Sequence, residues 1–288
     1  MLGLRDRRGA PGAPRLRPTL PLRAAAHLGR GELRRLRGVQ VVDAGHGYDV
    51  FGMHPDWVAV AVWASRFGHD HWFRVTAHGA ENLPARGRAI LAANHGGIMP
   101  IDAAMLYADV LAHTDPARAP RAIADHFISA LPFVSTLLAR VGAVAGTRGN
   151  VERLLEAEEL LMIFPEGVAG MAKPRRKHYQ LSAWRVGHAE LALRHRAPVI
   201  PVAIIGAEEQ WPLLARLDGL HPVGAPFVVL PATLLPLPVR MHIHYGAPLH
   251  LEGDADDPRQ VAAAAQRVRG EVQRLLDHGL ATRHGIFT

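Results

Sequence analysis

The 288-residue chain contains no cysteine, which excludes disulfides, thiolate metal sites and an acyl-cysteine intermediate. It also has no apolar run of the roughly 18–20 residues that a membrane-spanning helix needs. The nearest candidate, residues 225–239, is shorter and is broken by four prolines. No secretory signal is recognisable at the N-terminus. We therefore expect a cytoplasmic protein that lies on a membrane surface rather than crossing it.

Several common enzyme signatures are missing as well. No GxSxG elbow is present, which argues against a standard α/β-hydrolase. No GxxxxGK[ST] loop or GxGxxG turn follows a strand, so nucleotide binding has no support. Histidine is frequent, with 18 residues, but His242 and His244 on one strand face have no evident third ligand, and HDH at 69–71 is no stronger. No metal or redox cofactor is expected.

Positive charge is concentrated near the N-terminus. Residues 1–40 hold ten arginines and two acids, a charge of +8, whereas the whole chain carries +7. This Pro-, Gly- and Arg-rich stretch lacks apolar periodicity, and we expect it to be a disordered tail. Such an arm can contact anionic lipid or nucleic acid. Since residues 41–288 are nearly neutral, a nucleic-acid partner is not expected, and a solvated extension is the simplest interpretation.

Residues 41–288 have the pattern of a single α/β domain. Apolar segments typical of buried strands alternate with amphipathic segments typical of helices. The expected strands are 71–79, 88–93, 142–148, 160–164, 198–206 and 240–246; the expected helices are 54–67, 102–113, 131–142, 150–159, 182–196 and 258–279. This alternation predicts a mostly parallel sheet flanked by helices, with reactive groups at the carboxyl ends of its strands.

The segment NHGGIMPID at 94–102 places His95 at the end of an expected strand and Asp102 before an expected helix. By themselves, the two residues fit a loop and an N-cap. The alternative is a catalytic pair, and three further fragments favour it because they follow in order. They are the Gly142-to-Arg148 segment, FPEG at 164–167 and VIPVAIIG at 199–206.

This order of four blocks resembles the glycerolipid acyltransferase superfamily over about residues 51–249. The resemblance implies that His95 is a general base that deprotonates a lipid hydroxyl, and that Asp102 orients the imidazole. The freed oxygen would attack the thioester of acyl-CoA or acyl-carrier protein, the donor substrate. We also expect the backbone N–H groups of Gly96 and Gly97 to face the oxyanion.

The same resemblance implies residues that bind substrate. These are Arg148, Phe164, Pro165, Glu166, Gly167 and Lys173. Glu166 would accept hydrogen bonds from acceptor hydroxyls, and Arg148 would bind phosphate. Lys173 would meet CoA phosphates or anionic headgroups. The ordinary alternatives are a tight turn for FPEG, a surface arginine, and a solvated run of charge around Lys173.

Two departures from the family pattern bear on the acceptor. Six residues separate His95 from Asp102 where four are usual, and this longer form resembles a diacylglycerol-acyltransferase-like branch. Val168 and Ala169 follow FPEG where enzymes acting on lysophosphatidate usually have Thr-Arg. We therefore expect a less charged lipid hydroxyl as acceptor, with the apolar, Pro-rich segment 217–238 as an acyl-chain wall or a membrane-facing loop. Lysophosphatidate acylation and a non-catalytic lipid-binding role remain alternatives.

Overall fold

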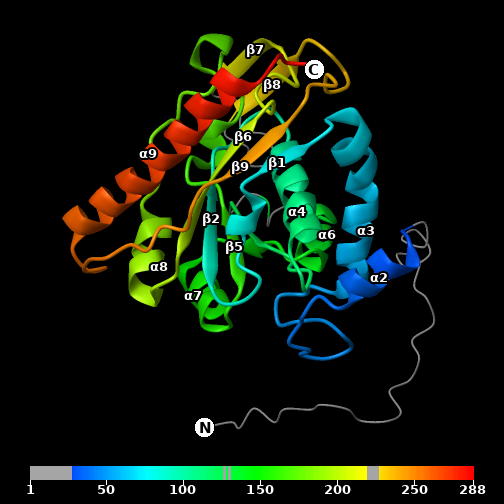
Figure 1. The fold of residues 1–288 in the computed structure, drawn as a ribbon, viewed down its shortest axis with the longest axis vertical. Helices are drawn as coiled ribbons and strands as arrows, with labels where there is room; N and C mark the ends of the chain where they lie inside the picture. Colours follow the sequence, from blue (N-terminus) through cyan, green and yellow to red (C-terminus); the bar gives the residue numbers. More distant parts are fainter. Residues whose placement is uncertain (1–27, 126–127, 129–130, 219–226) are drawn as a thin grey trace.

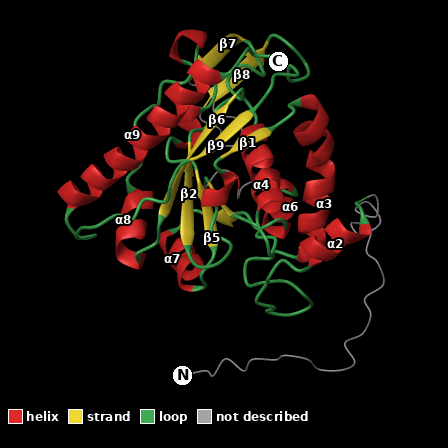
Figure 2. Cartoon of the chain, viewed as in Figure 1, coloured by secondary structure: helices red, strands yellow, loops and turns green. Residues whose placement is uncertain are grey.

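The computed structural model describes residues 28–125, 128, 131–218 and 227–288. These residues form a seven-stranded sheet covered by helices on both faces, with a separate two-stranded hairpin at one end (Figures 1 and 2). Every neighbouring pair in the large sheet is parallel except β6 with β9, which is antiparallel. The prediction of an α/β fold with a mostly parallel sheet is confirmed.

The sheet has the strand order β1-β9-β6-β2-β5-β3-β4. Its strands are β1 (Thr76–His78), β2 (Ala89–Ala93), β3 (Arg121–Ala124), β4 (Val144–Ala145), β5 (Leu160–Ile163), β6 (Val199–Ile205) and β9 (His242–Tyr245). The hairpin joins β7 (Leu213–Asp218) to β8 (Phe227–Pro231). Strand β2 lies between β5 and β6, and all five of its residues are buried. A strand covered on both faces needs a continuous apolar run such as AILAA.

The helices divide between the two faces of the sheet (Figure 1). They are α2 (Arg30–Arg37), α3 (Pro55–Arg66), α4 (Ile101–His113), α6 (Val134–Arg140), α7 (Arg148–Glu156), α8 (Gly187–His195) and α9 (Pro258–Thr282). Alternate residues of β2 enter two cores: Leu91 packs with α3 and α4, and Ile90 packs with α7, α8 and α9. The period-two alternation of the strand thus separates the molecule into two sides.

The expected disorder is wrong for residues 30–37, which form helix α2. Leu36 is fully buried in the core shared with α3 and α4. Arg35 donates to the carbonyl of Leu111 at 2.5 Å, and Arg66 pairs with Glu32 at 2.9 Å. These contacts order a segment whose own sequence is poor in apolar residues. Residues 1–27 of the predicted tail lie outside the described residues.

Several element boundaries also differ from the sequence prediction. Asp102 is not the N-cap of α4; Pro100 holds that position, and Asp102 lies within the first turn. The expected helix from Ser182 begins only at Gly187, because the preceding backbone bonds to the FPEG turn instead. Within 71–79, only β1 is a strand, since residues 67–72 continue α3 as a π-helical turn. The segment 217–238 contributes β8 to the hairpin; its residues 219–226 lie outside the described ones.

Candidate active site

His95 and Asp102 meet in the interior. His95 follows the carboxyl end of β2, and its Nδ1 lies 2.7 Å from Oδ2 of Asp102 in the first turn of α4. His95 is 8% exposed and Asp102 is fully buried. The six-residue loop between them absorbs the extra length and returns the chain to the strand end. Because Asp102 occupies Nδ1, Nε2 is the nitrogen that remains for proton exchange.

Asp102 is fixed by two backbone groups in addition to His95. Its Oδ2 accepts a hydrogen bond from the Gly96 N–H at 2.9 Å, and its Oδ1 accepts one from the Ala103 N–H at 2.8 Å. The Gly96 N–H is therefore bonded to the carboxylate, which contradicts its expected role toward an oxyanion. Gly97 has a φ of +84°, and a Cβ there would collide with the Gln210 amide. Only Gly97 remains a candidate oxyanion donor of the two.

Phe164 lies against the imidazole of His95. The two ring centroids are 4.5 Å apart and their planes are tilted by 32°. Phe164 directly follows β5, the strand that pairs with β2, so the first residue of FPEG is brought to His95 by sheet register. This contact restricts the ring orientation that the Asp102 hydrogen bond has already selected.

Glu166 points into the protein, which contradicts its expected contact with an acceptor hydroxyl. The residue is 3% exposed. Its Oε2 accepts a hydrogen bond from the Ser182 N–H at 2.8 Å and lies 3.0 Å from Nζ of Lys173. Its Oε1 accepts a long bond, 3.4 Å, from the backbone N–H of His95. Glu166 therefore contacts the main chain of His95 and helps to hold it in place.

Lys173 is likewise internal, and the expectation that it meets CoA phosphates or headgroups is wrong. Its side chain is 4% exposed, and its Nζ lies between Glu166 and Glu208, 3.2 Å from Oε1 of the latter. Glu166 and Lys173 belong to one segment after β5, and Glu208 joins them from the loop after β6. A buried ammonium needs such partners, since an isolated one would be strongly destabilising.

Glu208 is a member of the site that the sequence analysis missed. It follows β6 and packs behind Gly96, where an added Cβ would lie 2.7 Å from Cγ of Glu208. Its Oε2 accepts a hydrogen bond from the Tyr179 N–H at 2.8 Å. Burial raises the pKa of Glu208 to about 7, although the nearby Lys173 opposes the shift. The sequence feature that could have identified Glu208 is the pair of acids, Glu208 and Glu209, shortly after the fully apolar strand β6.

The remainder of FPEG forms a tight turn, as its ordinary interpretation predicts. The Gly167 N–H donates to the Phe164 carbonyl at 2.8 Å, and Gly167 has a φ of +55°. The carbonyl of Pro165 accepts a bond from Arg185. The turn leads into the short helix η4 (Gly167–Gly170), where Gly170 packs on His95. The turn and helix η4 thus pack against His95.

Arg148 lies at the start of α7, outside this cluster. Its side chain is 58% exposed and pairs with Glu152 and Glu190, both at 2.9 Å. Another exposed cation lies nearer to FPEG: Arg185 packs beside Gly167, and its Nη2 is 3.6 Å from Oδ2 of Asp125. No local sequence feature separates Arg185 from other surface arginines, so its position near FPEG could not be predicted.

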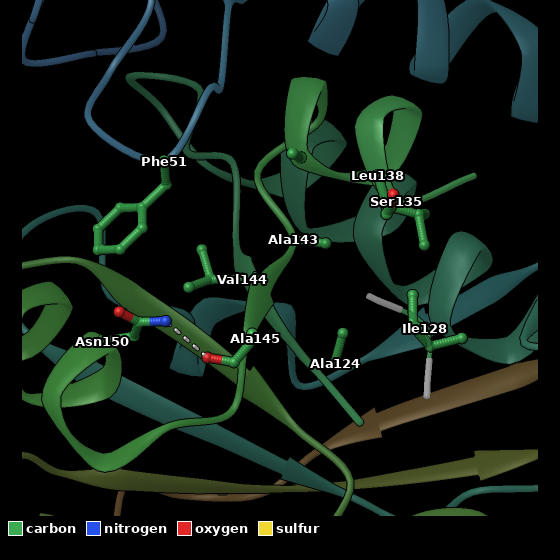
Figure 3. Close-up of a pocket in the computed structure, with 10 residues that line it drawn as sticks. Phe51, Ala124, Ile128, Ser135, Leu138, Ala143, Val144, Ala145 and Asn150 are labelled. Carbon is green, nitrogen blue, oxygen red and sulfur yellow. Dashed lines mark hydrogen bonds between the residues drawn. The ribbon is translucent and has the colours of Figure 1, made fainter. Parts of the chain in front are cut away.

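An apolar hollow of about 190 Å³ lies beside the Gly142-to-Arg148 segment (Figure 3). Leu138 and Ser135 of α6 face it from one side, and Val144 and Ala145 of β4 from another. Asn150 donates to the Ala145 carbonyl at 3.1 Å and stays at the rim. The hollow accommodates a small apolar group.

The described part of the chain contains neither a metal-holding group of side chains nor a helix that could cross a membrane. No three or more of its His, Asp and Glu side chains are placed to hold a metal ion together. Within the same residues, every helix is too short or too polar to span a bilayer.

Comparison with known proteins identifies the family. A family model described as acyltransferase matches residues 74–205. An uncharacterized protein of Mycobacterium tuberculosis is 35% identical over 84% of this chain and 72% of its own length. The human "DGAT1/2-independent enzyme synthesizing storage lipids" is 28% identical over 72% of this chain and 62% of its own length. The chain belongs to the glycerolipid-type acyltransferases.

The fold agrees with this assignment. The crystal structure of the 1-acyl-sn-glycerophosphate acyltransferase PlsC from Thermotoga maritima superposes with a TM-score of 0.53 at 17% identity, covering 80% of this chain and 83% of that one. At that identity the likeness shows a shared fold. The family match makes the protein an acyltransferase.

Proposed function

We propose that the protein transfers a fatty acyl group from an acyl thioester, acyl-CoA or acyl-carrier protein, to the hydroxyl of a weakly charged lipid. The observation that carries the proposal is the buried His95–Asp102 pair, with 2.7 Å between Nδ1 and Oδ2 at the carboxyl end of β2. A histidine held in this way by a carboxylate has a defined tautomer and a free Nε2, as a general base requires.

The transfer proceeds in one ternary complex. His95 Nε2 takes the proton of the acceptor hydroxyl, and the oxygen attacks the thioester carbonyl carbon. Asp102 stabilises the imidazolium that forms. As the tetrahedral intermediate collapses, the C–S bond breaks, and the imidazolium returns its proton to the leaving thiolate. The products are an ester and a free thiol, and no metal, redox cofactor or covalent enzyme intermediate takes part.

A weakly charged acceptor is supported by the charges near FPEG. Val168 and Ala169 follow the motif without a hydroxyl or a cation, and Lys173 is already paired with two carboxylates. The name of the human relative, which refers to storage lipids, agrees with a neutral acceptor. Exposed Arg185, beside Gly167, is the nearer cation for the phosphates of the donor. Arg148 is also exposed, but it would have to exchange its pairs with Glu152 and Glu190 for a phosphate.

Membrane contact is part of the proposal. Leu214 and Leu230 on the β7–β8 hairpin are 67% and 55% exposed, and Leu234 just after it is 97% exposed. Leucines exposed together on one projecting element are typical of a surface that meets lipid. The hairpin follows β6 and the Glu208 loop directly in the chain, so it places an apolar surface near the segment that backs the site. We propose a peripheral position on the cytoplasmic membrane face.

The test is release of CoA from a long-chain acyl-CoA in the presence of diacylglycerol, a long-chain alcohol, lysophosphatidate or no acceptor. Acceptor-dependent release is expected to fall at least about a hundredfold in His95→Ala. His250→Ala, which changes an exposed histidine, is the matched control and should keep full activity. Equal release by folded His95→Ala and wild type would contradict the proposal. Lipid binding without release of CoA from any donor would favour a non-catalytic lipid-binding protein.

A further inference from the structure

A second, larger hollow lies on the other side of the sheet from His95. It measures about 660 Å³ and opens between β1, β9 and the C-terminal end of α9. Successive side chains of β9 point to opposite faces of the sheet. Tyr245 points to Asp109 of α4, whereas His244, which lines the hollow, packs on Gly279 of α9. Asp102, the partner of His95, lies in α4 and therefore on the face of the sheet opposite to the hollow. The hollow is therefore separate from the acyl-transfer site.

Histidines from three elements converge on this hollow. The rings of His78 and His244 are stacked, with centroids 4.3 Å apart and planes 11° from parallel. His78 Nε2 lies 3.2 Å from His242 Nδ1, and His278 of α9 meets His244 edge to face at 6.2 Å. Ring nitrogens bonded to each other share one proton, so this contact favours uncharged imidazoles. In an uncharged pair the donating ring uses its only N–H in this bond. When the pair takes up one proton, both rings carry an N–H that can donate to a ligand.

Burial and the neighbouring positive groups act in the same direction on these histidines. Burial, followed by the other histidines, lowers the pKa of His244 to about 4. Burial also lowers the pKa of His78 and His242, with His278 adding to the shift at His78, and His78, Arg240 and Arg283 adding to it at His242. A bound anion would reverse the shift. Its binding would therefore be accompanied by proton uptake and would strengthen as the pH falls.

The ionisable side chains that line the hollow are all basic: Arg240, Arg283 and the histidines, His284 included. Among the described residues, no aspartate or glutamate side chain lines it, and Arg283 is neutralised by a bidentate pair with Glu209 at 2.6 and 3.0 Å. The guanidinium of Arg240 makes no hydrogen bond or ion pair with another described residue, and its Nε is buried without a partner. Arg240 is partly exposed, so an anion in the hollow could take the place of the water that solvates its guanidinium.

We propose that this hollow binds an oxyanion of the phosphate class, with Arg240 as its charged ligand and the N–H groups of His78, His242 and His244 as further donors. Arginine forms two parallel hydrogen bonds with phosphate, and Thr76 and Thr282 are among the other residues that line the hollow. Its volume falls in the range of sites for small organic ligands, so it takes an organic phosphate as well as the free ion. A metal is a weaker fit, since no metal-holding group of three side chains occurs in the described residues.

The binding test is histidine-selective NMR of the full chain at about pH 6.5. Separate samples receive inorganic phosphate, dihexanoyl phosphatidic acid as a monomeric lipid phosphate, or sodium chloride at equal ionic strength. Saturable shifts of the His78, His242 and His244 ring signals with a phosphate probe, absent with chloride, are expected. Saturation by inorganic phosphate identifies the free ion as a sufficient ligand. Saturation by the lipid probe alone identifies a phosphomonoester lipid as the ligand.

Arg240→Met should raise the half-saturating phosphate concentration by about tenfold or more, because a charge-assisted bond is lost. Arg267→Met removes an exposed arginine from the middle of α9 and should leave binding unchanged. His242→Gln provides a second variant if Arg240→Met does not fold. Absence of saturable shifts with both probes, equal shifts with chloride, or equal binding by folded Arg240→Met would overturn the assignment. Acyl transfer is not used as a readout, so the result is independent of the proposed function.

Discussion

Lys173 Nζ lies 3.0 Å from Oε2 of Glu166 inside the protein, and the other oxygen of the same glutamate faces the backbone N–H of His95. The FPEG glutamate is therefore connected to the site through the main chain of His95. Glu208 completes the cluster on the other side of Lys173. One ammonium thus serves two carboxylates, and this imbalance underlies the first two predictions.

Lys173→Met should destabilise the fold by about 3–5 kcal/mol, because it leaves two carboxylates buried without a counter-charge. Urea denaturation measures the loss. The double variant Lys173→Met with Glu208→Gln should recover part of it, since it removes one of the unpaired charges. A single variant as stable as wild type would show that the ion cluster contributes little.

The stability should depend on pH through Glu208. Its folded-state pKa of about 7 exceeds the ordinary glutamate value of 4.5. Between these values the unfolded chain releases the proton first, so the free energy of unfolding falls as the pH rises from about 4.5 to about 7. The fall should be on the order of 2–3 kcal/mol in wild type and smaller in Glu208→Gln. Urea titrations at several pH values check this; parallel pH profiles for the two proteins would rule it out.

Asp102→Asn should lower kcat by about a hundredfold or more while the fold is kept. The amide oxygen can still accept a hydrogen bond from Gly96, but the charge that stabilises an imidazolium is lost. Steady-state kinetics with a saturating acyl donor measures kcat. Asp277→Asn, on the exposed face of α9, is the control and should behave as wild type. A loss confined to KM would point to substrate binding instead.

Gly170→Ala should lower activity through packing. A Cβ at this position would lie 2.9 Å from Cβ of Glu166 and 3.0 Å from both Cβ and the carbonyl oxygen of His95. Displacement of His95 by a few tenths of an ångström should reduce kcat about tenfold or more. Gly149→Ala adds the same methyl group where nothing lies within 4 Å and should be neutral. The two variants are compared in the CoA-release assay, and similar activities would refute the packing argument.

Replacing Leu234 and Leu235 by serine should weaken membrane binding. They are 97% and 69% exposed, and each leucine buried in lipid contributes about 1.5–3 kcal/mol when fully inserted. Co-sedimentation with phosphatidylcholine–phosphatidylglycerol vesicles should decrease about tenfold or more. Val50→Ser changes an apolar residue that is 71% exposed elsewhere and serves as the control. Unchanged sedimentation of the double variant would place membrane contact on another surface.

Local patterns were sufficient for the elements with strong apolar runs. Strands β2, β5 and β6 were predicted because AILAA, LLMI and VIPVAII are buried on both faces. Strand β3 was missed because its first residue, Arg121, is charged and so breaks the apolar pattern of a buried strand. The guanidinium of Arg121 is nevertheless buried, and it pairs with Asp49 at 2.6 Å. Helix α2 was missed because its sequence, RGELRRLR, is mostly charged. Its order depends on contacts with α3 and α4, far away in the sequence.

The sequence by itself determined the alternation of strands and helices, the four ordered blocks, and the candidates His95 and Asp102, because these depend on residue type and spacing along the chain. Only the tertiary structure decided which side chains face the site. It turned Glu166 and Lys173 inward, committed Gly96 to Asp102, and added Glu208 from beyond β6. Burial and ion pairing depend on segments that meet only when the sheet forms, and no local pattern contains that information.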